Sequence, residues 1–383
     1  MRLAGATPET VRAAIEHADP LPGAAGFAGN LDGWLVRDVL GRYPLFFEAE
    51  RPAVWSHDHC DLDKPRRLPA GHVLDLAAGD DRQTDASNFE TGPREIWTLP
   101  ALDAVESDTE GVTAVREALD TTLAEVAGGL DADGTDDAGD LAVAFSGGVD
   151  SALLAARLDA PLYVVGFPES HDIAAARSGA TLLERDLRVV ELDHATLEES
   201  VPKVVAATGR TNAMDIQIAL PLFVLARRVA ADGFDRLVLG QGADELFGGY
   251  AKVEKAPDDH RVAADTVRGA RDETVRTLPA QFERDHLALR GAGVEPVTPF
   301  AHDRVVRAAL ALDGDQLVRE GTRKWALRRA VRPWLPDELV GRDKKALQYG
   351  TLAARELDRL ARRAGYKRRM DDHVGRYIES LLS

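Results

Sequence analysis

The sequence predicts an α/β protein, in which a β-rich N-terminal part precedes a doubly wound parallel-sheet domain with a helical C-terminal part. Three observations predict this fold. Short apolar runs separated by Gly, Pro and Asp fill residues 21–76, apolar strands alternate with helical stretches from residue 141, and helical patterns dominate beyond about residue 260. Strand–helix alternation is typical of a parallel sheet that is covered by helices on both faces.

The N-terminal domain, residues 1–100, is expected to consist of short strands joined by turns. Its candidate strands are Ala25–Phe27, Trp34–Val36, Pro44–Phe47, Ala53–Trp55, His72–Leu74 and Glu95–Leu99. A polar stretch rich in turn-forming residues lies around residues 80–94, and we place the domain boundary near residue 100.

The second domain, residues 101–383, is expected to open with a helix over 109–126, where apolar residues recur at helical spacing. An acidic, Gly-rich segment over 128–140 then predicts a loop. The buried strands that follow are Leu141–Phe145, Leu162–Val165, Leu187–Leu192 and Leu237–Leu239, with helices over 151–158, 172–184 and 217–231.

Charge and cysteine content limit the classes of function. The 383 residues carry a formal net charge of −17, and this field repels a nucleic acid, whose binding needs clustered Lys and Arg. Acidic excess with few lysines suggests a halophilic host. No apolar run approaches the ~20 residues of a membrane span and the N-terminus lacks a signal-like segment, so no membrane partner and a cytoplasmic location are expected. The single cysteine, Cys60, rules out an internal disulfide and a Cys-rich metal site.

A Gly-rich turn joins the first strand of the predicted sheet to a helix. Leu141–Phe145 runs directly into Ser146-Gly147-Gly148-Val149-Asp150-Ser151. The two glycines let backbone N–H groups point inward, the serine hydroxyls add donors, and the helix dipole favours an anion. A carboxylate in such a loop would repel phosphate unless a cation lay between them, so Asp150 implies Mg²⁺. The structural alternative is a tight turn that Ser or Asp merely caps.

A second motif follows a later strand. Gly240-Gln241-Gly242-Ala243-Asp244-Glu245-Leu246-Phe247-Gly248-Gly249-Tyr250 comes directly after Leu237–Leu239. Because carboxyl ends of parallel strands meet at one edge of the sheet, where such folds bind ligands, Asp150 and Asp244 are expected to hold Mg²⁺ together. The alternative is that Asp244 and Glu245 only cap the next helix.

These two motifs resemble those of the asparagine-synthetase family of PP-loop ATP-pyrophosphatases, whose signatures are SGGxDS and [S/T]G[E/Q]G[S/A]DExFGGY. Further similarities follow in chain order: Val164–Phe167 with Ser170–Ala176, Gly293–Phe300 with Val297 where an arginine is usual, Lys324–Arg328, and Arg342–Gly350. The similarity is strong over residues 141–350 and weak over residues 20–76.

The resemblance implies an ATP-dependent, AMP-forming amide ligase, in which an aspartate carboxylate attacks ATP and ammonia displaces AMP from the adenylate. It implies catalytic roles for Lys324, Gln241 and Asp244, with Mg²⁺ held by Asp150 and Asp244. It also implies an ATP site formed by Phe145, Ser146, Gly147, Gly148, Asp150, Ser151, Val165, Leu239 and Gly240. Small-molecule substrates are the expected partners, and a homodimer is compatible with the family. Gln241 stands where many bacterial relatives have Glu, and a neutral amide accepts no proton at pH 7.

The N-terminal domain resembles a truncated copy of the family's glutaminase domain, an N-terminal-nucleophile sandwich. The similar segments are Gly26–Asp32, Arg37–Leu45 and Leu68–Leu74. That domain needs a cysteine just after the initiator Met, where this sequence has Arg2, and we expect Cys60 at the place of a later strand. We therefore expect no glutaminase activity and ammonia as the amine donor.

Three other functions stay open. A cyclising synthetase of the same family similarly lacks the N-terminal cysteine and would suit the unusual stretch Asn212–Gln217. A PP-loop tRNA-modifying enzyme usually needs catalytic cysteines and a basic face, and this sequence shows neither. A scaffold with an inactive site is disfavoured, because Ser146, Asp150, Asp244 and Lys324 are all present.

Overall fold

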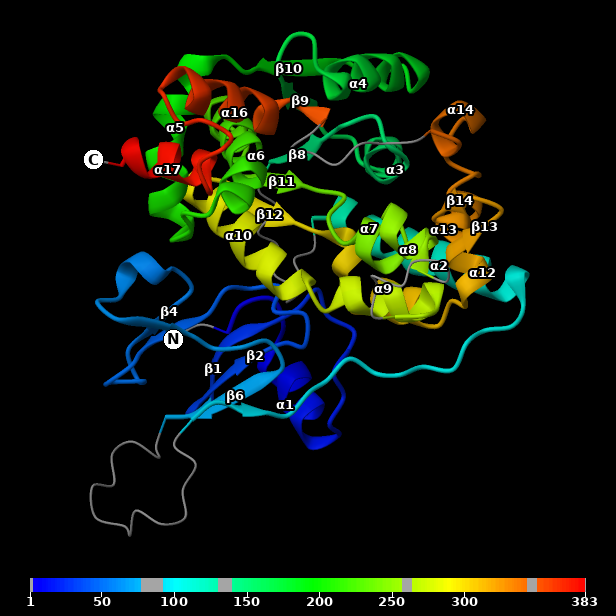
Figure 1. The fold of residues 1–383 in the computed structure, drawn as a ribbon. Coiled ribbons are helices and arrows are strands. Elements are labelled where there is room, and N and C mark those ends of the chain that lie inside the picture. Colours follow the sequence, from blue (N-terminus) through cyan, green and yellow to red (C-terminus); the bar gives the residue numbers. More distant parts are fainter. Residues whose placement is uncertain (1–2, 77–91, 130–139, 257–263, 343–349, 383) are drawn as a thin grey trace. The chain divides into compact units, whose positions relative to one another are not determined.

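The computed structural model describes residues 3–76, 92–129, 140–256, 264–342 and 350–382 (Figure 1). Contacts group the chain into two compact units, each made of three stretches. Unit 1 consists of Met1–Ala138, Gln241–Glu283 and Thr298–Ala330, and unit 2 of Gly139–Gly240, Arg284–Val297 and Val331–Ser383. This grouping follows packing, so the domain boundary near residue 100 stays a prediction.

Unit 2 is built on a five-stranded sheet in the order β10-β9-β8-β11-β12, with parallel pairing throughout. The strands are β8 (Leu141–Ala144), β9 (Leu162–Gly166), β10 (Leu187–Glu191), β11 (Arg236–Val238) and β12 (Glu295–Val297). The strand order reverses between β8 and β11, the switch point at which doubly wound folds bind ligands. The predicted parallel α/β fold is confirmed.

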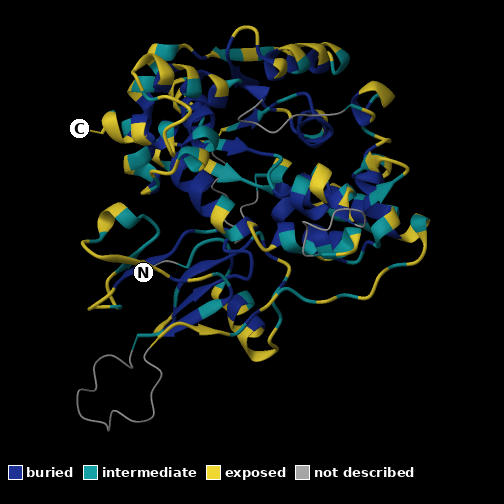
Figure 2. Ribbon diagram, viewed as in Figure 1, coloured by how far each residue is buried: buried dark blue, intermediate teal, exposed yellow. Residues whose placement is uncertain are grey.

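Helices cover both faces of this sheet. Successive strand residues point to opposite sides, and apolar residues on each side pack against helices. Ala142 of β8 belongs to a large apolar cluster with helices α5, α6, α16 and α17. Phe145, three residues further on, lies against Gly179 of α4 on the other side. The strand residues between these layers are largely buried (Figure 2).

The helices of unit 2 begin at residues that suit helix starts. Ser170, Asp193 and Asn212 each accept a hydrogen bond from a backbone N–H of the first turn, which satisfies a donor that has no partner within the helix. The helices are α3 (Val149–Arg157), α4 (His171–Leu182), α5 (His194–Thr208), α6 (Ala213–Ala231), α14 (Asp337–Val340), α16 (Ala353–Arg363) and α17 (His373–Ser380). Helix α10 (Leu278–Gly291) contributes residues to both units.

The β-rich part of unit 1 contains two antiparallel sheets with the strand orders β1-β2-β6-β7 and β4-β3-β5. The first consists of β1 (Ala28–Leu31), β2 (Trp34–Arg37), β6 (His72–Asp75) and β7 (Arg94–Glu95), the second of β3 (Phe46–Glu48), β4 (Trp55–Ser56) and β5 (Pro65–Arg67). Asp32 and Gly33, both at positive φ, form the two-residue turn between β1 and β2. Leu35, Phe47 and Leu74 are buried together in the apolar core of this part.

The remaining elements of unit 1 are mostly helical. They are α1 (Pro8–Glu16), the 3-10 helix η1 (His59–Asp61), α2 (Asp108–Ala127), α7 (Ala243–Leu246), α8 (Ala251–Glu254), α9 (Val267–Val275), the 3-10 helix η4 (Pro299–Ala301), α11 (Asp303–Leu310), α12 (Gly314–Leu317), β13 (Val318–Arg319), β14 (Thr322–Arg323) and α13 (Trp325–Ala330). Buried Arg42 joins the β-rich part to α11, since it lies 2.9 Å from Asp38 and 2.6 Å from Asp303.

Several predicted elements are wrong in detail. Residues 25–27 precede strand β1, and Cys60 lies in η1 instead of a strand. Lys324, the first residue of the segment Lys324–Arg328, stands just before helix α13. The loop predictions over 80–94 and 128–140 fall largely outside the described residues. Among the helices of the described residues, none has both the length and the apolar composition that a membrane crossing requires.

Candidate active site

The loop between β8 and α3 closes on itself in unit 2. Ser151 Oγ donates to the carbonyl of Gly148 at 3.1 Å and accepts the backbone N–H of Ser146 at 3.2 Å. Helix α3 has Gly148 as its N-cap and no side-chain cap, so neither serine nor Asp150 is used for capping. The loop therefore has the form of an anion-binding turn at a helix N-terminus.

Gly147 is pressed against the neighbouring helix α4. Its φ is +74°, and a Cβ there would lie only 2.5 Å from the carbonyl oxygen of Ala175, so this position accepts glycine alone. Arg342 binds the two segments together, donating to the Ala175 carbonyl at 2.9 Å and to that of Gly147 at 3.4 Å. The rest of the predicted basic loop, residues 343–349, lies outside the described residues.

The ends of β8 and β11 meet, as the sequence predicts. Asp150, in the first turn of α3, is only 5% exposed. A Cβ on Gly240, just after β11, would lie 3.1 Å from the Cβ of Asp150. The side chains of Phe145, Val165 and Leu239 are buried at the strand ends, so they shape this edge rather than offer it polar groups.

Unit 1 contains the second part of the predicted site, an ion pair between Lys324 and Asp244. Lys324 Nζ lies 2.7 Å from Asp244 Oδ1, and Lys324 is only 6% exposed. Asp244 stands inside α7, whose N-cap is Gly242 with no side-chain cap, so capping is not its role. Lys324 adopts a left-handed backbone with φ +56°, a conformation that is often retained where function requires it.

The absence of a side chain at Gly249 leaves room for this ion pair. A Cβ there would lie 2.0 Å from Asp244 Oδ1 and 2.5 Å from Lys324 Cε. The Gly249 N–H donates to the Asp244 carbonyl at 2.8 Å, and Arg323 donates to the Gly249 carbonyl at 2.8 Å. Gly249 and Arg323 were not among the predicted site residues, although the paired glycines of the second motif were the available signal.

Glu245 is a buried carboxyl that sequence reasoning also missed. It is 3% exposed and accepts a hydrogen bond from Tyr250 Oη at 2.5 Å. Burial, together with the negative charge of Asp244, raises the pKa of Glu245. Gln241 is partly buried at the start of this segment.

Each unit thus brings together part of the predicted site. Unit 2 contains the loop, Asp150 and the end of β11, while unit 1 contains Gln241, Asp244 and Lys324. Chemically, the first part offers backbone and hydroxyl donors to an anion, and the second offers one ammonium beside one carboxylate. A Mg²⁺ shared by Asp150 and Asp244 stays a prediction.

Comparison with known proteins identifies the family. The asparagine synthase family model matches residues 135–290 and 268–374, a span that includes both motifs and Lys324. The chain belongs to the asparagine synthase family.

Individual relatives agree with this family assignment. A protein of Methanocaldococcus jannaschii, provisionally named glutamine-hydrolysing asparagine synthetase 1, is 27% identical over 91% of this chain and 72% of its own length. The glutamine-hydrolysing asparagine synthetase of Brassica oleracea is 27% identical over 54% of this chain. The match spans only 39% of the Brassica protein.

Among solved structures, the NMN synthetase of Francisella tularensis is 11% identical and covers 73% of this chain and 94% of its own, with a TM-score of 0.31.

Proposed function

We propose that this family member is an ATP-dependent amide-forming ligase that activates the β-carboxylate of aspartate as its adenylate and transfers it to ammonia. The observation that carries the proposal is the closed Ser146–Ser151 loop, with buried Asp150 beside Gly240 at the sheet's switch point. This arrangement suits a nucleotide phosphate with a cation. Family membership supports amide formation as the reaction that ATP drives.

The residues divide the work of adenylation. Backbone N–H groups of Gly147 and Gly148 and the hydroxyl of Ser146 bind phosphate oxygens, and the N-terminus of α3 adds a favourable dipole. Lys324 neutralises charge that builds up on the phosphates during attack. Holding the substrate carboxylate in line with the α-phosphorus of ATP raises the rate of adenylation further.

Mg²⁺ suits the carboxylates of this site. Asp150 and Asp244 offer the hard oxygen atoms that Mg²⁺ prefers, and Asp150 is buried where the strand ends meet. These two residues would hold the ion, which when bound supplies charge screening for the leaving pyrophosphate.

Ammonia, rather than glutamine, is proposed as the nitrogen source. Cys60 is exposed in η1, and desolvation together with the charges of Asp58 and Asp61 raises the pKa of its thiol. A thiol held in its neutral form is a poor nucleophile. Cys60 therefore lacks the activation that glutamine hydrolysis requires.

The polar stretch that suited a cyclising synthetase has local structural roles. Asn212 caps α6, and Asp215 forms ion pairs with Arg210 at 3.0 Å and with Arg284 at 3.1 Å. These contacts give Asn212 and Asp215 structural roles, and the cyclising synthetase stays the alternative.

The proposal is tested by supplying MgATP, ammonium and single carboxylates to the purified protein while pyrophosphate and AMP are measured. Aspartate should give the two products in equal amounts. Asp150→Asn and Asp244→Asn should abolish release, because each removes a charge that faces Mg²⁺. Lys324→Ala should slow it by roughly 10²- to 10³-fold.

Circular dichroism of each variant controls for folding. Release of ADP and phosphate, or full turnover in these variants, would overturn the proposal. A response to another carboxylate alone would keep adenylation and replace aspartate.

A further inference from the structure

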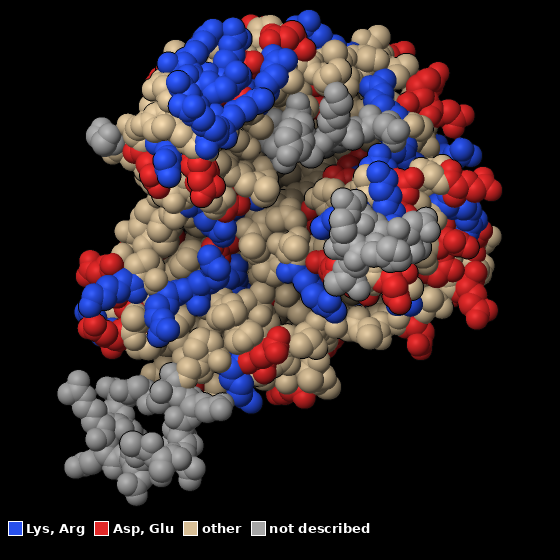
Figure 3. Space-filling view, in the orientation of Figure 1, with Lys and Arg blue, Asp and Glu red and all other residues tan. Residues whose placement is uncertain are grey.

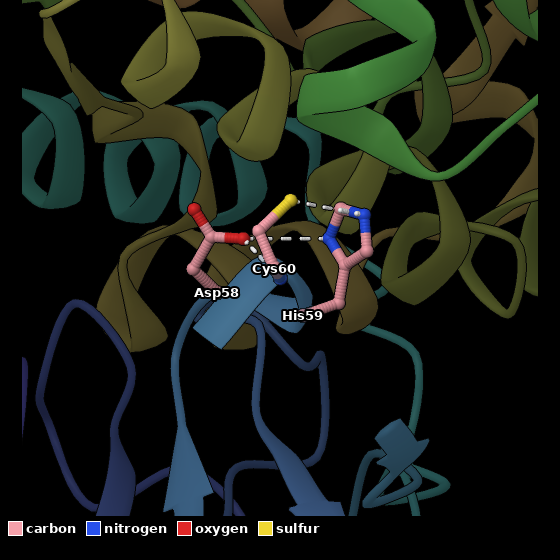
Figure 4. Close-up of side chains that lie close together, drawn as sticks. All are labelled: Asp58, His59 and Cys60. Atoms are coloured by element: carbon pink, nitrogen blue, oxygen red, sulfur yellow. Dashed lines mark hydrogen bonds and ion pairs between the residues drawn. The ribbon is translucent and has the colours of Figure 1, made fainter. Parts of the chain in front are cut away.

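The turn that contains Cys60 brings three kinds of metal-ligand atom together. Asp58, His59 and Cys60 lie at η1, between β4 and β5 (Figure 4). A carboxylate oxygen, an imidazole nitrogen and the thiol sulfur all lie within 4.8 Å of one another. This cluster is outside the residues assigned to ATP.

Two pairs of atoms in this turn lie at distances close to those between the ligands of a tetrahedral metal centre. His59 Nδ1 lies 3.5 Å from Asp58 Oδ1, and His59 Nε2 lies 3.6 Å from Cys60 Sγ. Zinc bonds of about 2.0–2.3 Å place neighbouring tetrahedral ligands roughly 3.3–3.8 Å apart. Because the two ring nitrogens face different partners, binding through one nitrogen requires a rotation of the His59 ring.

Contacts within the turn order its backbone and the side chain of Asp58. Asp58 Oδ1 accepts the N–H of Cys60 at 2.8 Å, and Ser56 Oγ accepts the N–H of Asp58 at 3.0 Å. The ring of His59 packs against Phe46, with 5.8 Å between centroids. Ligands on a turn that is already ordered lose little conformational freedom when an ion binds.

We propose that Asp58, His59 and Cys60 bind one divalent transition-metal ion, with zinc as the ion that suits the donors and water completing the coordination. Mixed oxygen, nitrogen and sulfur donors favour zinc over Mg²⁺ or Ca²⁺, which prefer oxygen alone. Cys60 is exposed and the side chain of Asp58 is 50% exposed, so solvent reaches the remaining position.

The negative charges around the thiol favour a cation at this turn. Asp58 and Asp61 disfavour the thiolate of Cys60, and the same carboxylates attract a positive ion. A coordinated divalent cation reverses the preference, because a metal-bound thiol loses its proton. Binding therefore releases one proton from Cys60.

The test uses the full-length protein without a histidine tag, titrated with Zn²⁺ by calorimetry and with Co²⁺ as an optical probe. Wild type should bind one ion, release a proton and show a thiolate-to-cobalt charge-transfer band. Cys60→Ser should abolish the band and weaken binding by at least about tenfold, the cost of losing even an outer partner. Asp58→Asn keeps the oxygen that caps η1 and should weaken binding similarly.

Asp61→Asn is the matched control, since it removes the same charge from the same turn without removing a proposed ligand. It should keep the band and bind within a few-fold of wild type. The proposal is overturned by a cobalt complex without the thiolate band, by unchanged binding in Cys60→Ser, or by equal losses in Asp61→Asn and Asp58→Asn. Circular dichroism establishes that each variant is folded.

Discussion

The ion pair of Lys324 and Asp244 has almost no space beside it. The Lys324 side chain is buried, while that of Asp244 is 37% exposed, so the cost of desolvation falls mainly on the lysine. The left-handed backbone of Lys324 adds about 1–3 kcal/mol of strain. Such a cost is consistent with selection for a function rather than for stability, and Gly249 supplies the space in which the pair forms.

Gly249→Ala should therefore abolish pyrophosphate release while the protein stays folded. The added methyl group would overlap Asp244 Oδ1 and Lys324 Cε and would lie 2.9 Å from the Cα of Asp244, so both side chains must move aside and the backbone at Asp244 must shift slightly. Steady-state turnover and circular dichroism of the variant check this together. Normal turnover would show that the observed ion pair is not needed for the reaction.

The lowered pKa of His302 predicts a change of stability with pH that comes from this one residue. Burial, with the charges of Arg304 and Arg42, lowers the pKa of His302 from 6.5 to about 3. The unfolded chain then binds a proton between these pH values that the folded protein does not bind. Stability from this residue is present above pH 6.5 and is lost as pH falls toward 3.

Compared with His302→Asn, wild type should lose up to about 1.4 kcal/mol more unfolding free energy per pH unit in that window. Asparagine can still accept the N-cap hydrogen bond that His302 Nδ1 accepts from Arg304. Urea unfolding across the pH range measures both proteins. Parallel pH profiles would mean that His302 is protonated with a normal pKa in the folded state.

Motifs made some of these residues predictable and left others hidden. Asp150 and Lys324 were predictable because their neighbours in sequence form recognisable patterns. The contact of Arg342 with the Ala175 carbonyl joins positions 167 residues apart, and sequence spacing gives no indication of such a pair.

At the scale of elements, the loop after β8 is locked against α4 at Gly147. Gly147→Ala would combine left-handed strain with a contact of 2.5 Å to the Ala175 carbonyl. Gly233→Ala is the matched control, because Gly233 also has a positive φ, +92°, but nothing lies within 4 Å of a Cβ there.

Both substitutions should cost roughly 1–2 kcal/mol for the left-handed conformation, and Gly147→Ala should cost more because the backbone at Ala175 must also shift. Only Gly147→Ala should also weaken ATP binding. Thermal unfolding and equilibrium binding of MgATP measure the two effects. Equal ATP affinity in both variants would contradict the proposed role of this loop.

The elements that sequence reasoning found are those with strong patterns. Strands β8, β9 and β11 and helix α2 were predicted because their apolar positions repeat regularly. Strand β12 was missed because it is short and contains Pro296, which restricts a strand to the sheet edge. Helix α1 was missed although Thr7 caps it and Pro8 occupies its first turn, both of which are helix-start signals.

Across the whole molecule, the segments that pack together are not consecutive in the sequence. Each unit gathers three stretches of sequence, and local patterns do not predict which distant stretches pack together. The arrangement of charged side chains on the surface also cannot be read from the sequence alone. On the face drawn in Figure 3, basic side chains gather over α16, yet Arg355, Arg359 and Arg362 there pair with carboxylates at 2.9–3.4 Å.

Carboxylate adenylation is tested most directly by following the transfer of oxygen from the carboxylate to AMP. The protein is supplied with MgATP, ammonium and aspartate whose side-chain carboxylate carries ¹⁸O, and the AMP produced is examined by mass spectrometry. Attack of the carboxylate on the α-phosphorus predicts one ¹⁸O atom in each AMP formed. AMP without label, formed together with asparagine, would contradict the account.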